Sequence, residues 1–99
     1  MFLARVQLPE NSNYDQLHKA MEEVHFLRFF DDSNNHSREL PQGTYLHPGI
    51  IGIKEAFASV ENVAKNVNKN AMVVLIEAAT DRDFMFSDNL PTFNKRNHS

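Results

Sequence analysis

The sequence predicts an α+β fold, the ferredoxin-like βαββαβ plait, in which two helices cover one face of a four-stranded antiparallel sheet. Apolar alternation and short β-branched or aromatic runs predict four strands, near residues 2–8, 26–30, 43–47 and 71–78. Apolar residues at helical spacing predict helices over 14–24 and 53–68. The resulting order of strand, helix, strand, strand, helix and strand fits two right-handed split crossovers, which place both helices on the same face.

The first strand and the first helix have the clearest patterns. Alternate residues of the strand point to the helix-covered face: Phe2, Ala4, Val6 and Leu8. Pro9 ends the strand because it cannot donate to a sheet, and we expect Ser12 to cap the helix that follows. The helix turns one apolar stripe inward: Tyr14, Leu17, Met21 and Val24.

The rest of the chain gives coarser expectations. Residues 31–37 form a polar loop with nothing apolar to bury, and residues 71–78 predict a strand that is buried on both faces. The second helix is expected to bury one stripe: Ile53, Phe57, Val60, Ala64 and Val67. We expect one domain over residues 1–86 and a loosely ordered polar tail over 87–99. The expected anchors of this end are Phe84, Phe86 and Phe93.

Composition excludes several classes of function. The 99 residues fit one domain, and no apolar run approaches the roughly 20 residues that a membrane helix needs. The chain has no cysteine, so disulfides, cysteine zinc sites and thiol nucleophiles are excluded and a cytosolic location is expected. The N-terminus lacks the pattern of a signal peptide. A net charge of −3 argues against coating nucleic acid by bulk electrostatics.

The five histidines are the first candidates for chemistry. Their spacing matches no metal-site motif, and the three glycines form no phosphate loop, so we expect no metal and no cofactor. His36 lies in the polar loop close to Arg38, as a general acid or base for phosphodiester transfer would, although solvated surface is the simpler interpretation.

The face of the sheet that no helix covers is the second candidate. Leu3, Arg5 and Gln7 point to it, and Arg28 joins them if its neighbours face the helices. A small sheet whose open face mixes apolar and basic groups commonly dimerises or binds RNA there. Arg5 and Arg28 therefore contact phosphates, or form ion pairs across a dimer interface.

The segment from Arg38 to Tyr45, with the sequence Arg-Glu-Leu-Pro-Gln-Gly-Thr-Tyr, resembles the GhoS family, the antitoxins of type V toxin–antitoxin systems. The resemblance extends over most of residues 2–84, with a first helix about one turn shorter. Further similar positions are Pro9, Ser12, Tyr14, Met21, His25, Phe26 and the stretch from Ile76 to Phe84.

This resemblance implies a ferredoxin-like fold and a sequence-selective endoribonuclease that destroys the mRNA of a small membrane toxin. Gln7 stands where GhoS has an acidic residue, which disfavours a metal-dependent mechanism. A basic pair in the first helix of GhoS is replaced here by Gln16, His18 and Lys19.

Together these observations give the hypothesis of a GhoS-like antitoxin that cuts a toxin mRNA by metal-independent transesterification. His18 or His36 transfers protons, and Arg28 or Arg38 steadies the phosphate. The expected RNA contacts are Arg5, Lys19 and Arg28. We expect a homodimer, through the open face or the edge of the second strand, and no membrane contact.

Two alternatives remain open. One is a non-catalytic binding, regulatory or inhibitor module from a phage or other mobile element, which meets a protein partner. The other is a plait that senses a small molecule at a dimer interface, although no residue pattern in the sequence indicates such a site.

Overall fold

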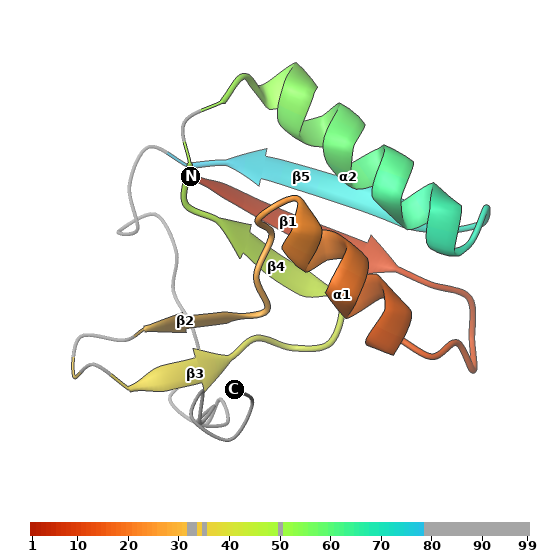
Figure 1. Ribbon diagram of the computed structural model, residues 1–99, viewed down its shortest axis with the longest axis horizontal. Coiled ribbons are helices and arrows are strands. Elements are labelled where there is room, and N and C mark those ends of the chain that lie inside the picture. The colour runs from red at the N-terminus through yellow and green to blue at the C-terminus, as the bar shows by residue number, and fades with distance from the viewer. Residues whose placement is uncertain (32–33, 35, 50, 79–99) are drawn as a thin grey trace.

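The computed structural model describes residues 1–31, 34, 36–49 and 51–78. These residues form an α+β protein with two helices, a three-stranded antiparallel sheet and a separate two-stranded one (Figure 1). The predicted polar tail and its anchors Phe84, Phe86 and Phe93 lie outside the described residues.

β1 (Phe2–Gln7) is the central strand of the larger sheet. It pairs antiparallel with β4 (Thr44–His47) on one side and with β5 (Met72–Glu77) on the other, so that Leu3 lies opposite both Leu46 and Ile76. Both helices, α1 (Asp15–Glu23) and α2 (Ile53–Val67), cover the same face of this sheet (Figure 1).

The alternation predicted for the first strand is confirmed. Phe2, Ala4 and Val6 are fully buried under the helices, whereas Arg5 and Gln7 are exposed on the opposite face. The helices contribute small and medium side chains to the same core: Leu17, Met21, Ala56, Val60 and Ala64. The core therefore lies between one face of the sheet and the two helices, and the other sheet face carries no helix of the described chain.

An additional strand, which the sequence did not predict, begins at Ser37, the last residue of the predicted polar loop. β2 (Phe29–Asp31) pairs antiparallel with β3 (Ser37–Glu39) in a hairpin beside the main sheet. The pairing depends on backbone groups and on polar contacts, including a 2.7 Å hydrogen bond from the Ser37 hydroxyl to the Asp31 carboxylate. Hydrophobic periodicity cannot reveal such a strand, because β3 buries no apolar side chain.

The start of α1 also differs from the prediction. The helix begins at Asp15, and Ser12 does not cap it, because the Ser12 hydroxyl donates to the Pro9 carbonyl. The side chain of Asn13 instead accepts the N–H of Asp15 at 2.8 Å. The apolar stripe is as predicted: Leu17 and Met21 are buried, and Tyr14 and Val24 pack against the core.

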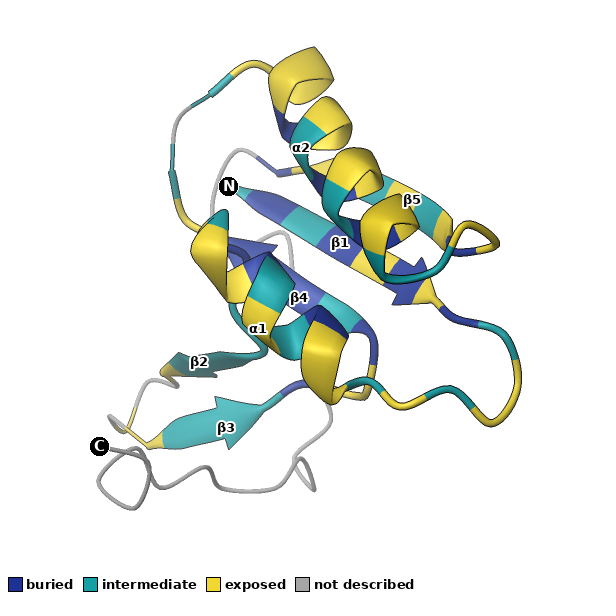
Figure 2. Ribbon diagram, turned by 45° about the vertical axis from the view of Figure 1, so that its right-hand side comes forward, coloured by how far each residue is buried: buried dark blue, intermediate teal, exposed yellow. Residues whose placement is uncertain are grey.

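The buried stripe predicted for α2 is confirmed at Val60 and Ala64 but is wrong in the first turns of the helix, and the prediction for β5 is wrong on one face. Ile53 and Phe57 are 45% and 36% exposed, and the buried position in the first turns is Ala56. β5 has one exposed face, formed by Met72, Val74 and Ile76, rather than two buried ones (Figure 2). Among the described residues β5 pairs only with β1 and has helices on one side only, so nothing there covers its other face.

Candidate functional site

His18 and Tyr45 form the core of the candidate site. His18 follows the buried Leu17 on α1 and is itself half-buried, while Tyr45 on β4 is only 1% exposed. His18 Nδ1 lies 2.8 Å from the Tyr45 hydroxyl oxygen, and the two rings meet edge to face. Burial, reinforced by Tyr14, raises the pKa of the Tyr45 hydroxyl, so this hydroxyl stays protonated at neutral pH.

Tyr14 fixes the helix end from which His18 projects. Its hydroxyl accepts the N–H of Leu8 at 3.0 Å, which ties the start of α1 to the residue after β1. The Tyr14 ring is 6.4 Å from the His18 ring, centroid to centroid. Two tyrosines from different parts of the chain therefore hold the imidazole in one orientation.

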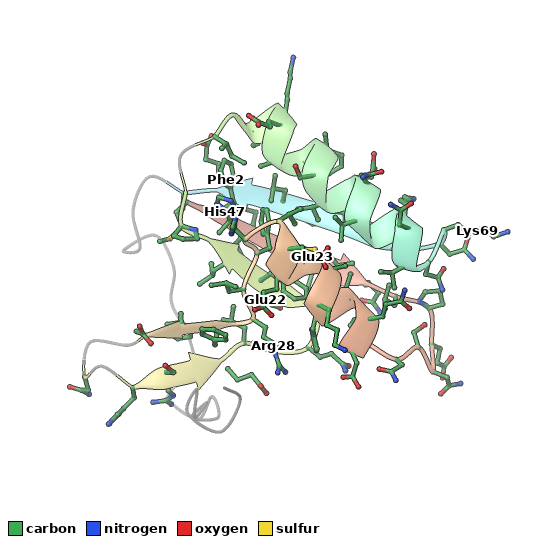
Figure 3. The ribbon with its side chains drawn as sticks, in the orientation of Figure 1. Phe2, Glu22, Glu23, Arg28, His47 and Lys69 are labelled. Carbon is green, nitrogen blue, oxygen red and sulfur yellow. The ribbon has the colours of Figure 1, made fainter. Side chains whose placement is uncertain are left out.

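An ion pair between Arg28 and Glu39 acts electrostatically on this imidazole. Arg28 Nη1 is 3.3 Å from Glu39 Oε2, and both side chains are about one third exposed, at 34% and 35%. The Leu40 N–H donates to the Arg28 carbonyl at 2.7 Å, so the pair sits at the base of the β2–β3 hairpin. Arg28 lies between α1 and this hairpin (Figure 3).

Burial and the Arg28 charge lower the pKa of His18, against the smaller opposing effects of Asp15 and Glu39. The imidazole is therefore neutral at pH 7. When Nδ1 donates to the Tyr45 oxygen, Nε2 carries the lone pair and is able to accept a proton. A neutral base, oriented by a tyrosine and placed beside a guanidinium, is an arrangement suited to proton removal next to a bound anion.

The other residues predicted for RNA contact are divided between two faces. Lys19 is exposed on α1, next to His18 in sequence. Arg5 is exposed on the opposite face of the sheet, where it donates to the carbonyl of Gln42. Arg28 does not join Arg5 on that face, because the bend before β2 directs it toward His18 and Glu39.

His36 and Arg38 belong to the hairpin. His36 is exposed just before β3, and Arg38 lies opposite Phe30 within it. The Ser37 end of β3 lies farther from α1 than the Glu39 end, which is at the base of the hairpin (Figure 1). The structure thus brings together His18 and Arg28 of the predicted set and places His36 toward the far end of the hairpin.

A second pair of histidines has a structural role. His47 is 7% exposed, and its ring packs against Phe26 and Phe2 at centroid distances of 4.8 and 6.1 Å (Figure 3). Its Nδ1 accepts the N–H of Gly49 at 2.9 Å, and the His25 ring lies 6.3 Å away. Burial and the His25 charge lower the pKa of His47. This histidine is a hydrogen-bonded member of the core.

Metal binding has no support in the part of the chain that the structure describes. No three ligand-type side chains of His, Cys, Asp or Glu come together there. Over the same residues, no helix has the length and the apolar character that crossing a membrane requires.

Tyr45, Tyr14 and Glu39 belong to the site but could not be recognised in the sequence. Tyr45 was visible only as one aromatic residue of a strand, and Glu39 as one residue of a polar stretch. No spacing connects positions 18, 28, 39 and 45, because tertiary packing alone brings them together.

Comparison of this chain with protein-family models, with curated proteins and with solved structures finds no match.

Proposed function

We propose that this chain is a cytosolic antitoxin of the GhoS kind, a metal-independent endoribonuclease that acts on a toxin mRNA. The observation that carries the proposal is the half-buried imidazole of His18, whose Nδ1 lies 2.8 Å from the Tyr45 hydroxyl oxygen and whose pKa is lowered by burial and by the Arg28 charge. The resemblance of residues 38–45 to the GhoS family supports the choice of RNA as substrate.

The proposed reaction is transesterification at one phosphodiester. His18 Nε2 removes the proton from a ribose 2′-hydroxyl, and the 2′-oxygen attacks the neighbouring phosphorus. The bond to the 5′-oxygen breaks, this oxygen takes a proton from solvent, and a 2′,3′-cyclic phosphate remains on the upstream fragment. Arg28 stabilises the charge that builds on the phosphoryl oxygens.

Phosphate binding requires Arg28 to exchange Glu39 for the substrate. Breaking the ion pair with Glu39 costs little, because the pair is about one third exposed, and surface ion pairs contribute only about 0–1 kcal/mol. Glu39 then serves to keep Arg28 in place until RNA arrives. Lys19 and Arg5 offer further phosphate contacts, although only Lys19 lies on the helix that carries His18.

The proposed fold is the ferredoxin-like plait with a much reduced fourth strand. The proposal is supported by an isolated bridge, in which Leu27 and Leu46 exchange backbone hydrogen bonds of 2.8 and 2.7 Å on the side of β4 that faces away from β1. The chain then leaves the sheet to form the β2–β3 hairpin. Slow amide exchange at both Leu27 and Leu46 would support this interpretation, and fast exchange at Leu27 would contradict it.

A non-catalytic binding module is the second candidate. The net charge of −3 and the exposed apolar side chains of β5 favour association with a protein over association with RNA. In this alternative, the contacts of His18 and Arg28 only fix α1 and the hairpin to the sheet.

The experiment that separates these functions is cleavage of a labelled mixed RNA pool, with and without EDTA. His18→Asn is the test variant, because the Asn side chain keeps a polar atom near the Nδ1 position for Tyr45 and removes Nε2. His36→Asn is the matched control on the hairpin. We expect defined cuts with cyclic phosphate ends that survive EDTA, a loss of about 100-fold or more in His18→Asn, and little change in His36→Asn.

Each other outcome contradicts part of the proposal. Equal cleavage by His18→Asn and the parent excludes His18 as the base, and loss of cleavage only in His36→Asn moves the site to the hairpin. Cuts that vanish in EDTA exclude a metal-independent reaction. Intact RNA at every salt and protein concentration rejects the nuclease and favours the binding module.

A further inference from the structure

Large apolar side chains gather around the outer edge of β5. Five large hydrophobic residues of the described chain are conspicuously exposed, and all come from this strand or from the helix turns above it: Ile53, Phe57, Met72, Val74 and Ile76. Their exposed fractions run from 36% for Phe57 to 64% for Met72. Exposed apolar groups that gather in one place, rather than scatter singly, mark a surface for association.

These side chains lie on both sides of the strand. On the helix side, a shallow hollow of about 290 Å³ is lined by Ile53, Lys54, Phe57 and Leu75. On the open face, Met72, Val74 and Ile76 form a row of exposed side chains. A strand added at this edge would therefore cover apolar surface above and below itself.

The backbone at the outer edge of β5 can form hydrogen bonds with a further strand. Among the described residues β5 has β1 as its only neighbour. The N–H of Ala78 donates to the Met1 carbonyl at 2.9 Å, so the even-numbered residues of β5 form the hydrogen bonds with β1. The backbone N–H and C=O groups of Val73 and Leu75 therefore point away from β1. From Met72 to Ile76 the edge has no proline and no charged residue, the usual devices that prevent such pairing.

We propose that a second copy of this chain occupies the edge, with the two β5 strands antiparallel about a two-fold axis at Val74. Val73 and Leu75 of one copy then exchange hydrogen bonds with Leu75 and Val73 of the other. Met72 lies opposite Ile76, and Val74 lies opposite Val74. The two three-stranded sheets join into one continuous sheet.

The charges at the ends of β5 favour a second copy in this register. Glu77 lies opposite the small Ala71 of the other copy, near the turn between α2 and β5 that carries the exposed Lys69 (Figure 3). Moving the register by two residues toward the C-terminus places Glu77 opposite Val73, so the carboxylate meets the apolar side of the strand. The edge is thus complementary to itself, which is what a two-fold interface requires.

Cysteine cross-linking tests the register, because the parent chain has no cysteine. A non-hydrogen-bonded antiparallel pair holds its Cα atoms about 4.5 Å apart, within the range that a disulfide spans. We expect Val74→Cys to form a disulfide-linked dimer rapidly on mild oxidation. Met72→Cys is the matched control on the same face, because its two copies would lie about 13 Å apart along the paired strands.

Sedimentation equilibrium of the cysteine-free chain tests the association itself. We expect a dimer of the parent, a dissociation constant at least about 10-fold higher for Val74→Lys, and no change for Gln16→Lys, which adds the same charge on the exposed side of α1. Mixing Val74→Lys with Val74→Glu should restore the dimer, because the two side chains meet on the axis.

Three results overturn the proposal: a parent that stays monomeric at all concentrations, a dimer unaffected by Val74→Lys, or equal cross-linking of the two cysteine variants. The last would indicate sheets stacked face to face.

Discussion

Gly43 shows how one residue fixes the path of the chain into the site. It precedes the strand that carries Tyr45, and its φ of +85° lies in the left-handed region that side chains disfavour. Its carbonyl accepts the N–H of Val6 at 2.7 Å, and a Cβ at Gly43 would collide with the backbone carbonyl oxygen of Val6. The turn therefore brings two backbones into contact at a place where only glycine fits.

Gly43→Ala should lower the free energy of unfolding by about 2 kcal/mol or more, because left-handed backbone costs an alanine about 1–2 kcal/mol and the contact with Val6 adds to it. Gly52→Ala is the matched control, since a Cβ at Gly52 would meet no other atom within 4 Å and the φ of this residue is −68°. Urea unfolding of both variants measures the difference. Equal stability of the two variants would show that the turn tolerates a side chain.

The candidate site could be predicted only one residue at a time. His18 and Arg28 were recognisable from the sequence as groups that suit RNA chemistry. That they meet, with Arg28 turned to the helix side, depends on the bend before β2 and on the Glu39 carboxylate 3.3 Å away. His36 has equally suitable neighbours along the chain, such as Arg38, but the structure places it on a different part of the surface.

At the scale of elements, the type of each helix and strand was easier to predict than its environment. The spacing in α2 defined a stripe through Val60 and Ala64, which the structure buries. The same spacing included Ile53, which is 45% exposed. A pattern of period 3.6 identifies an apolar side of a helix, but it does not tell which turns of that side lie above another element.

The different burial of Val60 and Ile53 predicts different losses of stability when each is replaced by alanine. Val60→Ala should cost about 1–3 kcal/mol of unfolding free energy because it leaves a cavity in a fully buried site. Ile53→Ala removes more atoms but should cost less than about 1 kcal/mol, since nearly half of that side chain already meets water. Urea unfolding at low protein concentration keeps association out of the comparison. A larger loss for Ile53→Ala would place that residue in the core after all.

At the scale of the whole molecule, the His18 site and the apolar edge of β5 lie toward opposite edges of the main sheet. The strand order is β4, β1, β5, so Tyr45 and His18 belong to the β4 side and the apolar edge belongs to the β5 side. A dimer through β5 therefore leaves both copies of the His18 site open and facing outward. The two proposals are compatible, and each can fail without the other.

Two histidines link the stability of the whole molecule to pH. Burial lowers the pKa of both His18 and His47 below the ordinary value of 6.5, and neighbouring positive charges from Arg28 and His25 act in the same direction. Well above pH 6.5 both side chains are neutral in the folded and unfolded states. As the pH falls below 6.5, the unfolded chain binds protons that the folded chain does not, so the free energy of unfolding decreases until the folded pKa values are reached.

Urea unfolding between pH 7.5 and 5 should therefore show a steady loss of stability that begins near pH 6.5. This window lies above the usual range of carboxylates, whose titration contributes mainly at lower pH. His47→Asn retains an acceptor for the Gly49 N–H and should flatten the slope, and adding His18→Asn should flatten it further. Stability that stays constant or rises as the pH falls would mean that neither imidazole is held neutral by the fold, and the proposed role of His18 as a base would lose its foundation.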